Sequence, residues 1–145
     1  MKTIESLINK HKGRRALIIA AGSSVRTNEN KINMLKNGKI PIYEPGLNNI
    51  VQKNVKEGRL NFTTDLQNSI KKSLVIFIAV GTPSGNDGSA DLQYVEDVAK
   101  TIGKNLNGYK VIVNKSTVPI GTGKKVRDII YSTVGDKYRF DVDST

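Results

Sequence analysis

Apolar and polar positions along the chain form two kinds of pattern. Continuous apolar runs at 16–21, 74–80 and 111–113 are typical of short strands buried on both faces, and a weaker run predicts a further short strand at 60–63. Between these runs, apolar residues recur at helical spacing. The helices predicted by this spacing cover residues 3–11, 28–37, 47–56, 66–72, 91–106 and 124–132. Strands that alternate with helices predict an α/β fold with a doubly wound parallel sheet.

The first predicted helix has a clear apolar side. Thr3 can cap this helix, and Ile4, Leu7 and Ile8 fall on one of its faces. We expect residues 1–27, which hold this helix and the first strand, to form an atypical N-terminal segment packed on the same domain. Residues 28–134 would then form the body of the domain, and residues 135–145 a tail without a strong pattern.

The composition is that of a globular domain. The chain has 145 residues, of which 37% are hydrophobic and 25% charged, so it is long enough for one domain and too apolar for a disordered chain. No apolar run approaches the roughly 18–20 residues that span a bilayer, and the first residues lack a signal-peptide pattern. We expect a soluble, cytoplasmic protein that does not contact a membrane.

Two residue types exclude several kinds of chemistry. The sequence has no cysteine, which excludes disulfides, thiolate metal sites and a cysteine nucleophile. Its one histidine, His11, excludes a histidine-rich metal site and argues against a Ser-His-Asp triad. No metal site is expected.

The net charge of +10 could favour phosphate-bearing partners. The basic residues are dispersed, however, and no helix-turn-helix, zinc-finger or RNP pattern accompanies them. Solvated helix faces explain the charge more simply, so nucleic-acid binding is disfavoured.

Three loops, at 22–24, 81–83 and 116–119, follow predicted strands at the end where sheets of this kind bind ligands. Their small and hydroxyl-bearing residues let the backbone approach a nucleotide, although ordinary turns have the same composition. The first loop keeps only Gly22 of the three glycines in a dinucleotide fingerprint. It also leaves no room for the usual crossover helix before the next helix begins.

Longer strings carry a family resemblance. They are Asn-Lys-Ile-Asn-Met-Leu-Lys-Asn-Gly from Asn30, Pro-Ile-Tyr-Glu-Pro-Gly-Leu from Pro41, Gly-Arg-Leu-Asn-Phe-Thr-Thr-Asp from Gly58, Phe-Ile-Ala-Val-Gly-Thr-Pro from Phe77, Asp-Gly-Ser-Ala-Asp-Leu from Asp87 and Lys-Ser-Thr-Val-Pro-Ile-Gly-Thr from Lys115. The segment that holds them resembles the UDP-glucose 6-dehydrogenase family of nucleotide-sugar dehydrogenases. The resemblance implies a Rossmann-like sheet, incomplete relative to the family, with 28–134 as a region like the family's NAD-binding domain.

Family members oxidise the 6-hydroxymethyl group of a UDP-sugar to a carboxylate with NAD. The resemblance therefore implies NAD, or another nucleotide, as the ligand. It implies that Val80, Gly81, Thr82 and Pro83 line the cofactor site together with Ser116, that Thr117 positions the catalytic water, and that Lys31 lies near the adenosine end. Gly22 is a further candidate for cofactor binding.

The departures from the family limit the expected activity. Residues 1–27 do not resemble the family's start, and the strand at 16–21 could take the place of either the first or the second family strand. The catalytic cysteine and the substrate domain of the family are missing. We therefore expect at most a nucleotide-binding fragment that is not catalytic alone. A non-catalytic interaction or regulatory module, with a protein partner or as a homo-oligomer, and a folded remnant of a gene rearrangement remain the alternatives.

Overall fold

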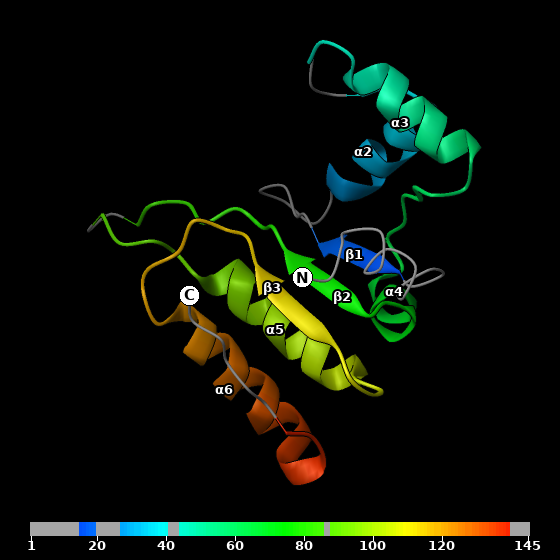
Figure 1. Cartoon of the computed structure of the whole chain (residues 1–145). Helices are drawn as coiled ribbons and strands as arrows, with labels where there is room; N and C mark the ends of the chain where they lie inside the picture. The colour runs from blue at the N-terminus through cyan, green and yellow to red at the C-terminus, as the bar shows by residue number, and fades with distance from the viewer. Residues whose placement is uncertain (1–14, 20–26, 41–43, 86–87, 140–145) are drawn as a thin grey trace, which may run out of the picture. The chain divides into compact units, whose positions relative to one another are not determined.

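Three short parallel strands form the sheet at the centre of the structure (Figure 1). A computed structural model describes residues 15–19, 27–40, 44–85 and 88–139, and for 27–31 it describes the backbone alone. The elements are β1 Ala16–Ile19, α2 Thr27–Lys36, α3 Leu47–Lys56, α4 Leu66–Lys72, β2 Val75–Ile78, α5 Gln93–Asn105, β3 Val111–Asn114, α6 Thr122–Val134 and a 3-10 turn at Gly135–Lys137. The chain divides into two compact units, Ala21–Leu66 and the remainder.

The sheet has the order β1-β2-β3, and both pairings are parallel. Ala16 pairs with Val75, which pairs with Val111 on its other side, so the three strands start level with one another. Helix α5 connects β2 to β3, as a parallel pair requires. The prediction of an incomplete α/β parallel sheet is confirmed.

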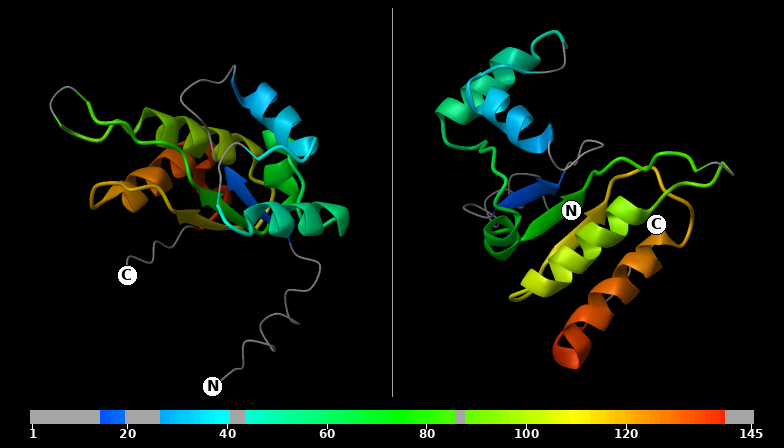
Figure 2. Two further views of the ribbon diagram at one scale, coloured as in Figure 1. Left: turned by 90° about the horizontal axis from the view of Figure 1, so that it is seen from above. Right: turned by 180° about the vertical axis from the view of Figure 1, so that it is seen from behind.

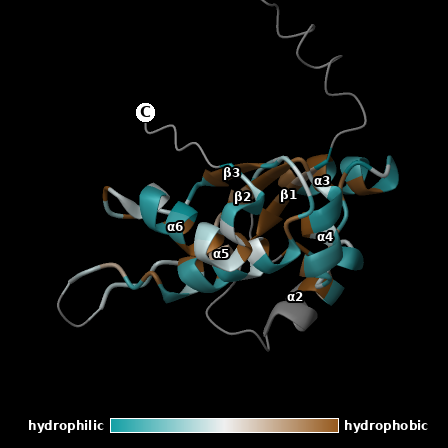
Figure 3. Ribbon diagram, turned by 90° about the horizontal axis from the view of Figure 1, so that it is seen from below, coloured by the Kyte–Doolittle hydropathy of each residue, from teal (hydrophilic) through white to brown (hydrophobic). Residues whose placement is uncertain are grey.

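One face of the sheet carries the hydrophobic core. Helices α4, α5 and α6 all lie on this side (Figures 2 and 3). Because side chains alternate across a strand, every second residue of each strand points towards these helices. The buried apolar residues are Ile19, Ile76 and Ile78 of the strands, Val80 just after β2, and Ile70, Val95, Val98, Ala99, Ile102, Val126 and Ile130 of the helices.

The opposite face of the sheet, which we call the open face, is also apolar. It consists of Ala16, Ile18, Val75, Phe77, Val111 and Val113, which the register brings together in two rows. None of α4, α5 and α6 covers these residues (Figure 3). Ile18 is 66% exposed and Val111 38% exposed. A sheet of the predicted kind has both faces covered, but the described helices of the unit that contains this sheet all lie on the other face.

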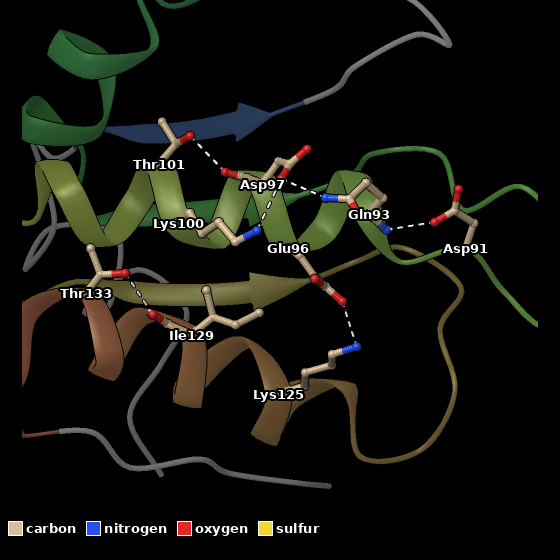
Figure 4. A network of polar contacts seen from close by, with 9 residues as sticks. All are labelled: Asp91, Gln93, Glu96, Asp97, Lys100, Thr101, Lys125, Ile129 and Thr133. Carbon is tan, nitrogen blue, oxygen red and sulfur yellow. Dashed lines mark hydrogen bonds and ion pairs between the residues drawn. The ribbon is translucent and has the colours of Figure 1, made fainter.

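Helices α5 and α6 pack closely against each other. A Cβ atom placed on Gly103 of α5 would lie 2.8 Å from Cβ of Thr133 on α6, so a glycine is required for this approach. Near the other end of the pair, Lys125 Nζ lies 2.6 Å from Glu96 Oε1 (Figure 4). Along α5, Asp97 Oδ1 accepts a hydrogen bond from Gln93, and the Asp97 carbonyl accepts one from Thr101 (Figure 4).

The second unit contains α2 and α3. Gly46, at φ 82°, begins α3 in a conformation that suits glycine. At the other end of α3, the Asn54 carbonyl accepts the backbone N–H groups of Arg59 and Leu60, and the Asn54 side chain accepts Arg59 Nε at 2.8 Å. No residue of α3 is buried.

Most predicted elements are confirmed, and α3 and α4 have the predicted bounds. The strand predicted at 60–63 is wrong, because no strand forms there. The N–H of Leu60 closes the turn after α3, and no strand in the described part of the chain pairs with this segment. The helix predicted at 3–11 and the end of the strand predicted at 16–21 lie outside the described residues, as does most of the tail at 135–145.

Candidate nucleotide-binding site

The carboxyl ends of the three strands meet at one edge of the sheet. Ile19, Ile78 and Asn114 are the last strand residues, and they are level in the register. The N–H of Ala79 donates to the Ile19 carbonyl at 2.9 Å, and the N–H of Lys115 donates to the Ile78 carbonyl at 2.8 Å. The loops that leave β2 and β3 therefore start side by side, as the sequence predicts.

Two hydroxyl groups tie these loops together. Ser116 Oγ, from the loop after β3, donates to the Val80 carbonyl at 2.8 Å. Thr82 Oγ1, from the loop after β2, donates to the Thr117 carbonyl at 2.8 Å. Each loop thus supplies one hydroxyl to a carbonyl of the other, and we call this pair of bonds the hydroxyl clasp. It brings together four of the residues that the sequence predicts for the site.

The hydroxyl clasp decides which ligand groups these side chains can meet. A hydroxyl has one proton and two acceptor lone pairs. Because Ser116 and Thr82 donate their protons to carbonyls, their oxygens offer only acceptor positions to a ligand. Such acceptors suit a carboxamide N–H or a ribose hydroxyl, whereas a fully ionised phosphate has no proton to donate.

One residue of the clasp is buried, and the residue that follows it borders open space. Val80 is buried, with an exposure of 4%. Gly81 faces open space, since a Cβ placed on it would meet nothing within 4 Å. Beyond Pro83, whose carbonyl accepts the N–H of Asp91 at 2.8 Å, the chain makes an excursion and returns to α5. A ligand can thus approach the backbone at Gly81.

The loop after β3 is also anchored to α6. Thr122 Oγ1 donates to the Pro119 carbonyl at 2.7 Å, and Thr122 is buried. Gly121 holds φ 90°, which allows the sharp entry into the helix. These contacts fix the position of the segment that carries Ser116 and Thr117.

Asn114 is a polar residue at this edge that the sequence interpretation missed. Its Oδ1 atom is buried and has no hydrogen-bond partner among the described residues. The register places Asn114 beside Ile78, on the covered face of the sheet. Leaving a buried acceptor unpaired costs about 1–3 kcal/mol, so this oxygen is a candidate to receive a donor. A polar residue ending the apolar run at 111–113 is the signal that could have identified it.

The structure does not test two of the predicted cofactor-binding residues. Gly22 lies outside the described residues, and so does the side chain of Lys31. The backbone of Lys31 belongs to α2 in the second unit. Their predicted roles remain predictions.

Neither a metal centre nor a membrane span is found within the described ranges. No three His, Cys, Asp or Glu residues cluster there in a way that could hold a metal ion. No helix in these ranges is long and apolar enough to cross a bilayer.

A parallel sheet with hydroxyl-bearing loops at its carboxyl edge defines a nucleotide-binding domain of the Rossmann type. Residues 20–145 match the model of the UDP-glucose/GDP-mannose dehydrogenase family, NAD binding domain. The chain therefore belongs to this family, and the expected family and cofactor class are confirmed.

Two relatives illustrate the likeness in sequence. The UDP-glucose 6-dehydrogenase TuaD of Bacillus subtilis is 60% identical over 114 residues, which are 79% of this chain and 25% of the relative. The UDP-glucose 6-dehydrogenase of Rhizobium meliloti is 56% identical over 110 residues, 75% of this chain and 25% of the relative. The chain spans about a quarter of the length of these curated relatives.

Solved structures agree on the fold. A GDP-mannose dehydrogenase from Pseudomonas aeruginosa superposes with a TM-score of 0.72 at 35% identity, covering 87% of this chain and 28% of that one. A UDP-glucose dehydrogenase from Pyrobaculum islandicum gives a TM-score of 0.71 at 29% identity, covering 85% of this chain and 34% of that one.

The register of the sheet also bears on a question that the sequence left open. In a Rossmann sheet the first strand lies beside the fourth, and the second strand does not. Here β1 pairs directly with β2, which carries the family string from Phe77. That β1 takes the place of the family's first strand is therefore the interpretation that this pairing favours, and it stays a prediction.

Proposed function

We propose that this chain binds NAD at the carboxyl edge of its sheet and that the hydroxyl clasp receives the nicotinamide riboside end. The observation that carries the proposal is the use of both hydroxyl protons on carbonyls. The remaining acceptors match the carboxamide and ribose donors of that end of the cofactor. The buried, unpaired Oδ1 of Asn114 at the same edge supports a ligand or partner that donates hydrogen bonds there.

The proposal assigns roles to the predicted residues. Val80, Gly81, Thr82 and Pro83 line one side of the cofactor, and Ser116 lines the other. Gly22 and Lys31 serve the pyrophosphate and adenosine parts. In a dehydrogenase NAD supplies a hydride acceptor, and Thr117 would position water beside it. Because NAD is an intracellular cofactor, the proposal also places the chain in the cytoplasm.

Nucleotide binding, rather than oxidation, is the proposed activity of these 145 residues. The sequence contains no cysteine, so it holds no thiol for the covalent step of the family. Oxidation of a UDP-sugar is an activity of the full-length relatives, and we do not assign it to this chain alone. A protein partner or a second copy remains a further candidate, supported by the open face of the sheet.

Chemical-shift mapping of the labelled chain with NAD tests this proposal. We expect shifts at the amides of Gly81, Thr82, Ser116 and Thr117. Nicotinamide mononucleotide should shift the same amides, whereas AMP should not, because only the former carries the carboxamide. UDP-glucose should leave these amides unchanged.

A matched pair of variants makes the test specific. Ser116→Ala removes one bond of the clasp, and we expect it to weaken NAD binding about fivefold, since one hydrogen bond contributes about 1 kcal/mol. Ser132→Ala removes an exposed hydroxyl that bonds to the Ile129 carbonyl within α6, and should leave binding unchanged. Absence of shifts at millimolar NAD, or equal effects of both variants, would contradict the proposal.

A further inference from the structure

A polar hollow lies at the amino edge of the sheet, where the strands begin and α4 ends (Figure 1). Its volume is about 330 Å³, within the range of about 300–1,000 Å³ that is usual for sites of small ligands. No residue of the unit Ala21–Leu66 lines it. We call it the basic hollow, and the lining side chains that matter here are Arg15, Lys71, Lys72, Asn107, Tyr109 and Lys110.

The charge of the basic hollow has one sign. Four of its lining residues, Arg15, Lys71, Lys72 and Lys110, are cationic, and the lining contains no aspartate or glutamate. None of the four forms an ion pair with a carboxylate in the ranges that the structure describes. Because like charges held together repel one another, an anion between them is favoured.

The end of α4 accounts for only part of this charge. The carbonyl end of a helix carries roughly half a negative charge, which favours a cation nearby. Lys110 already meets this end, since its Nζ donates to the Lys71 carbonyl at 3.2 Å and to the Ser73 carbonyl at 2.7 Å. The other three cations are in excess of what the helix end requires.

The cationic side chains retain donors for a ligand. An ammonium group has three N–H donors, and Lys110 uses two of them on carbonyls, so one remains. The guanidinium of Arg15 presents a planar fork that matches two phosphate oxygens. Burial lowers the pKa of Lys110, and an anion beside it would favour its charged form.

We propose that the basic hollow binds the phosphate chain of a small oligophosphate, either free or as part of a nucleotide. A phosphate chain carries several negative charges in a small volume, which suits four cations around one hollow. Tyr109 is 80% exposed, and its ring offers a face on which a nucleobase can stack. This site and the hydroxyl clasp lie at opposite ends of four-residue strands, about 13 Å apart at roughly 3.3 Å per residue, so the proposal does not depend on NAD binding.

Chemical-shift mapping of the full chain with tripolyphosphate, at low salt and without divalent cations, tests the proposal. We expect shifts at the amides of Ser73, Gly108 and Lys110, and none at those of Gly81 and Thr117. Absence of shifts at millimolar tripolyphosphate would overturn the proposal. Shifts at Gly81 and Thr117 alone would overturn it too, because the anion would then bind at the carboxyl edge.

Two double variants with the same change of charge make the test specific. Lys71→Gln combined with Lys72→Gln removes two cations from the hollow, and we expect tripolyphosphate to bind at least roughly tenfold more weakly. Lys100→Gln combined with Lys124→Gln is the control, because these exposed lysines of α5 and α6 do not line the hollow. It should weaken binding less than about twofold, since salt screens distant exposed charges. Equal weakening would mean that net charge alone attracts the anion, which contradicts a site.

ATP distinguishes the two sources of the phosphate chain. Tighter binding of ATP than of tripolyphosphate, with the difference lost in Tyr109→Ala, would support the proposal with a nucleotide as the ligand. Equal binding of both would support it with a free oligophosphate. Tighter binding of a short DNA duplex than of either would contradict it, because the cations would then belong to an extended nucleic-acid surface.

Discussion

At both ends of the strands, side chains donate hydrogen bonds to backbone carbonyls. At the carboxyl edge these donors are Ser116 and Thr82. At the amino edge, Lys110 Nζ donates to the Ser73 carbonyl at 2.7 Å, and Asn107 Nδ2 donates to the Lys71 carbonyl at 3.1 Å. The Lys71 carbonyl is one that the end of α4 leaves unpaired, and Ser73 follows α4 directly. Individual polar side chains thus fix the strand ends where the short strands alone provide few hydrogen bonds.

Replacing Thr82 with valine tests the clasp without changing the shape of the side chain. Thr82→Val removes the donor to the Thr117 carbonyl, and we expect a loss of about 0.5–1.5 kcal/mol in the free energy of unfolding. Thr101→Val is the control, because the carbonyl that Thr101 bonds lies one helical turn earlier and retains its backbone partner. Urea denaturation measures the free energy of unfolding of both variants. An equal loss in the two would show that the Thr82 hydrogen bond contributes no more to stability than a side-chain hydrogen bond within a helix.

Lys110 gives a prediction about pH. Burial lowers the pKa of Lys110 from its ordinary value of 10.5. The folded chain therefore releases this proton at a lower pH than the unfolded chain does. The penalty for burying the charge is fully present below the folded pKa and disappears above 10.5, so the stability contributed by Lys110 should rise with pH across that window.

Denaturation of the chain and of Lys110→Met between pH 8 and 10.5 checks this sign. The free energy of unfolding of the unsubstituted chain should increase relative to the variant as the pH rises. Lys104→Met, at an exposed position of α5, controls for the loss of a lysine. A relative stability that falls with pH would contradict the assignment.

At the scale of elements, the α5–α6 pair is closely packed. Buried residues of both helices face each other and the sheet, and Glu96 and Lys125 are paired across them. Both charged side chains remain partly exposed, so this ion pair is worth little on its own. Close packing, rather than charge, holds the two helices together.

Gly103→Ala tests that packing. Alanine favours a helix over glycine by about 1 kcal/mol, so at an open position the substitution would stabilise α5. Here the added Cβ would lie 2.8 Å from Cβ of Thr133, and overpacking of this kind costs about 1–3 kcal/mol. We expect a net loss of stability in urea denaturation. Lys104→Ala, at the adjacent exposed position, should change stability by less than about 0.5 kcal/mol, and a gain for Gly103→Ala would refute the close approach.

At the scale of the whole molecule, the two units differ in how much they bury. No residue of α3 is buried, whereas α5 alone buries Val95, Val98, Ala99, Ile102 and Gly103. Local unfolding is easiest where few apolar contacts form.

Hydrogen exchange followed by mass spectrometry should therefore separate the units. Peptides from α3 should exchange at least tenfold faster than peptides from α5 at the same pH and temperature. The comparison uses intact protein, and peptides from α6 provide an internal reference for the slow class. Equal protection of α3 and α5 would contradict the difference in burial.

Local patterns in the sequence predicted most of the elements, since the periodicity of 47–56 and 66–72 gives the bounds of α3 and α4. The strand at 60–63 could not be judged in this way, because a strand exists only when a neighbour pairs with it. The loops at 80–83 and 116–117 were identified by their composition and by the family strings. The direction of their hydroxyl protons and the unpaired oxygen of Asn114 depend on the pairing of β2 with β3, which no local pattern contains.

The register of β1 has a consequence for how the chain is made. β1 pairs with a strand that lies roughly 60 positions later, whereas β2, α5, β3 and α6 follow one another directly. Closing a loop of this length costs on the order of 3–4 kcal/mol of chain entropy. At a synthesis rate of about 5–20 residues per second, β1 leaves the ribosome roughly 3–12 seconds before its partner strand. For that interval the apolar residues of β1 have no partner strand and are available to chaperones.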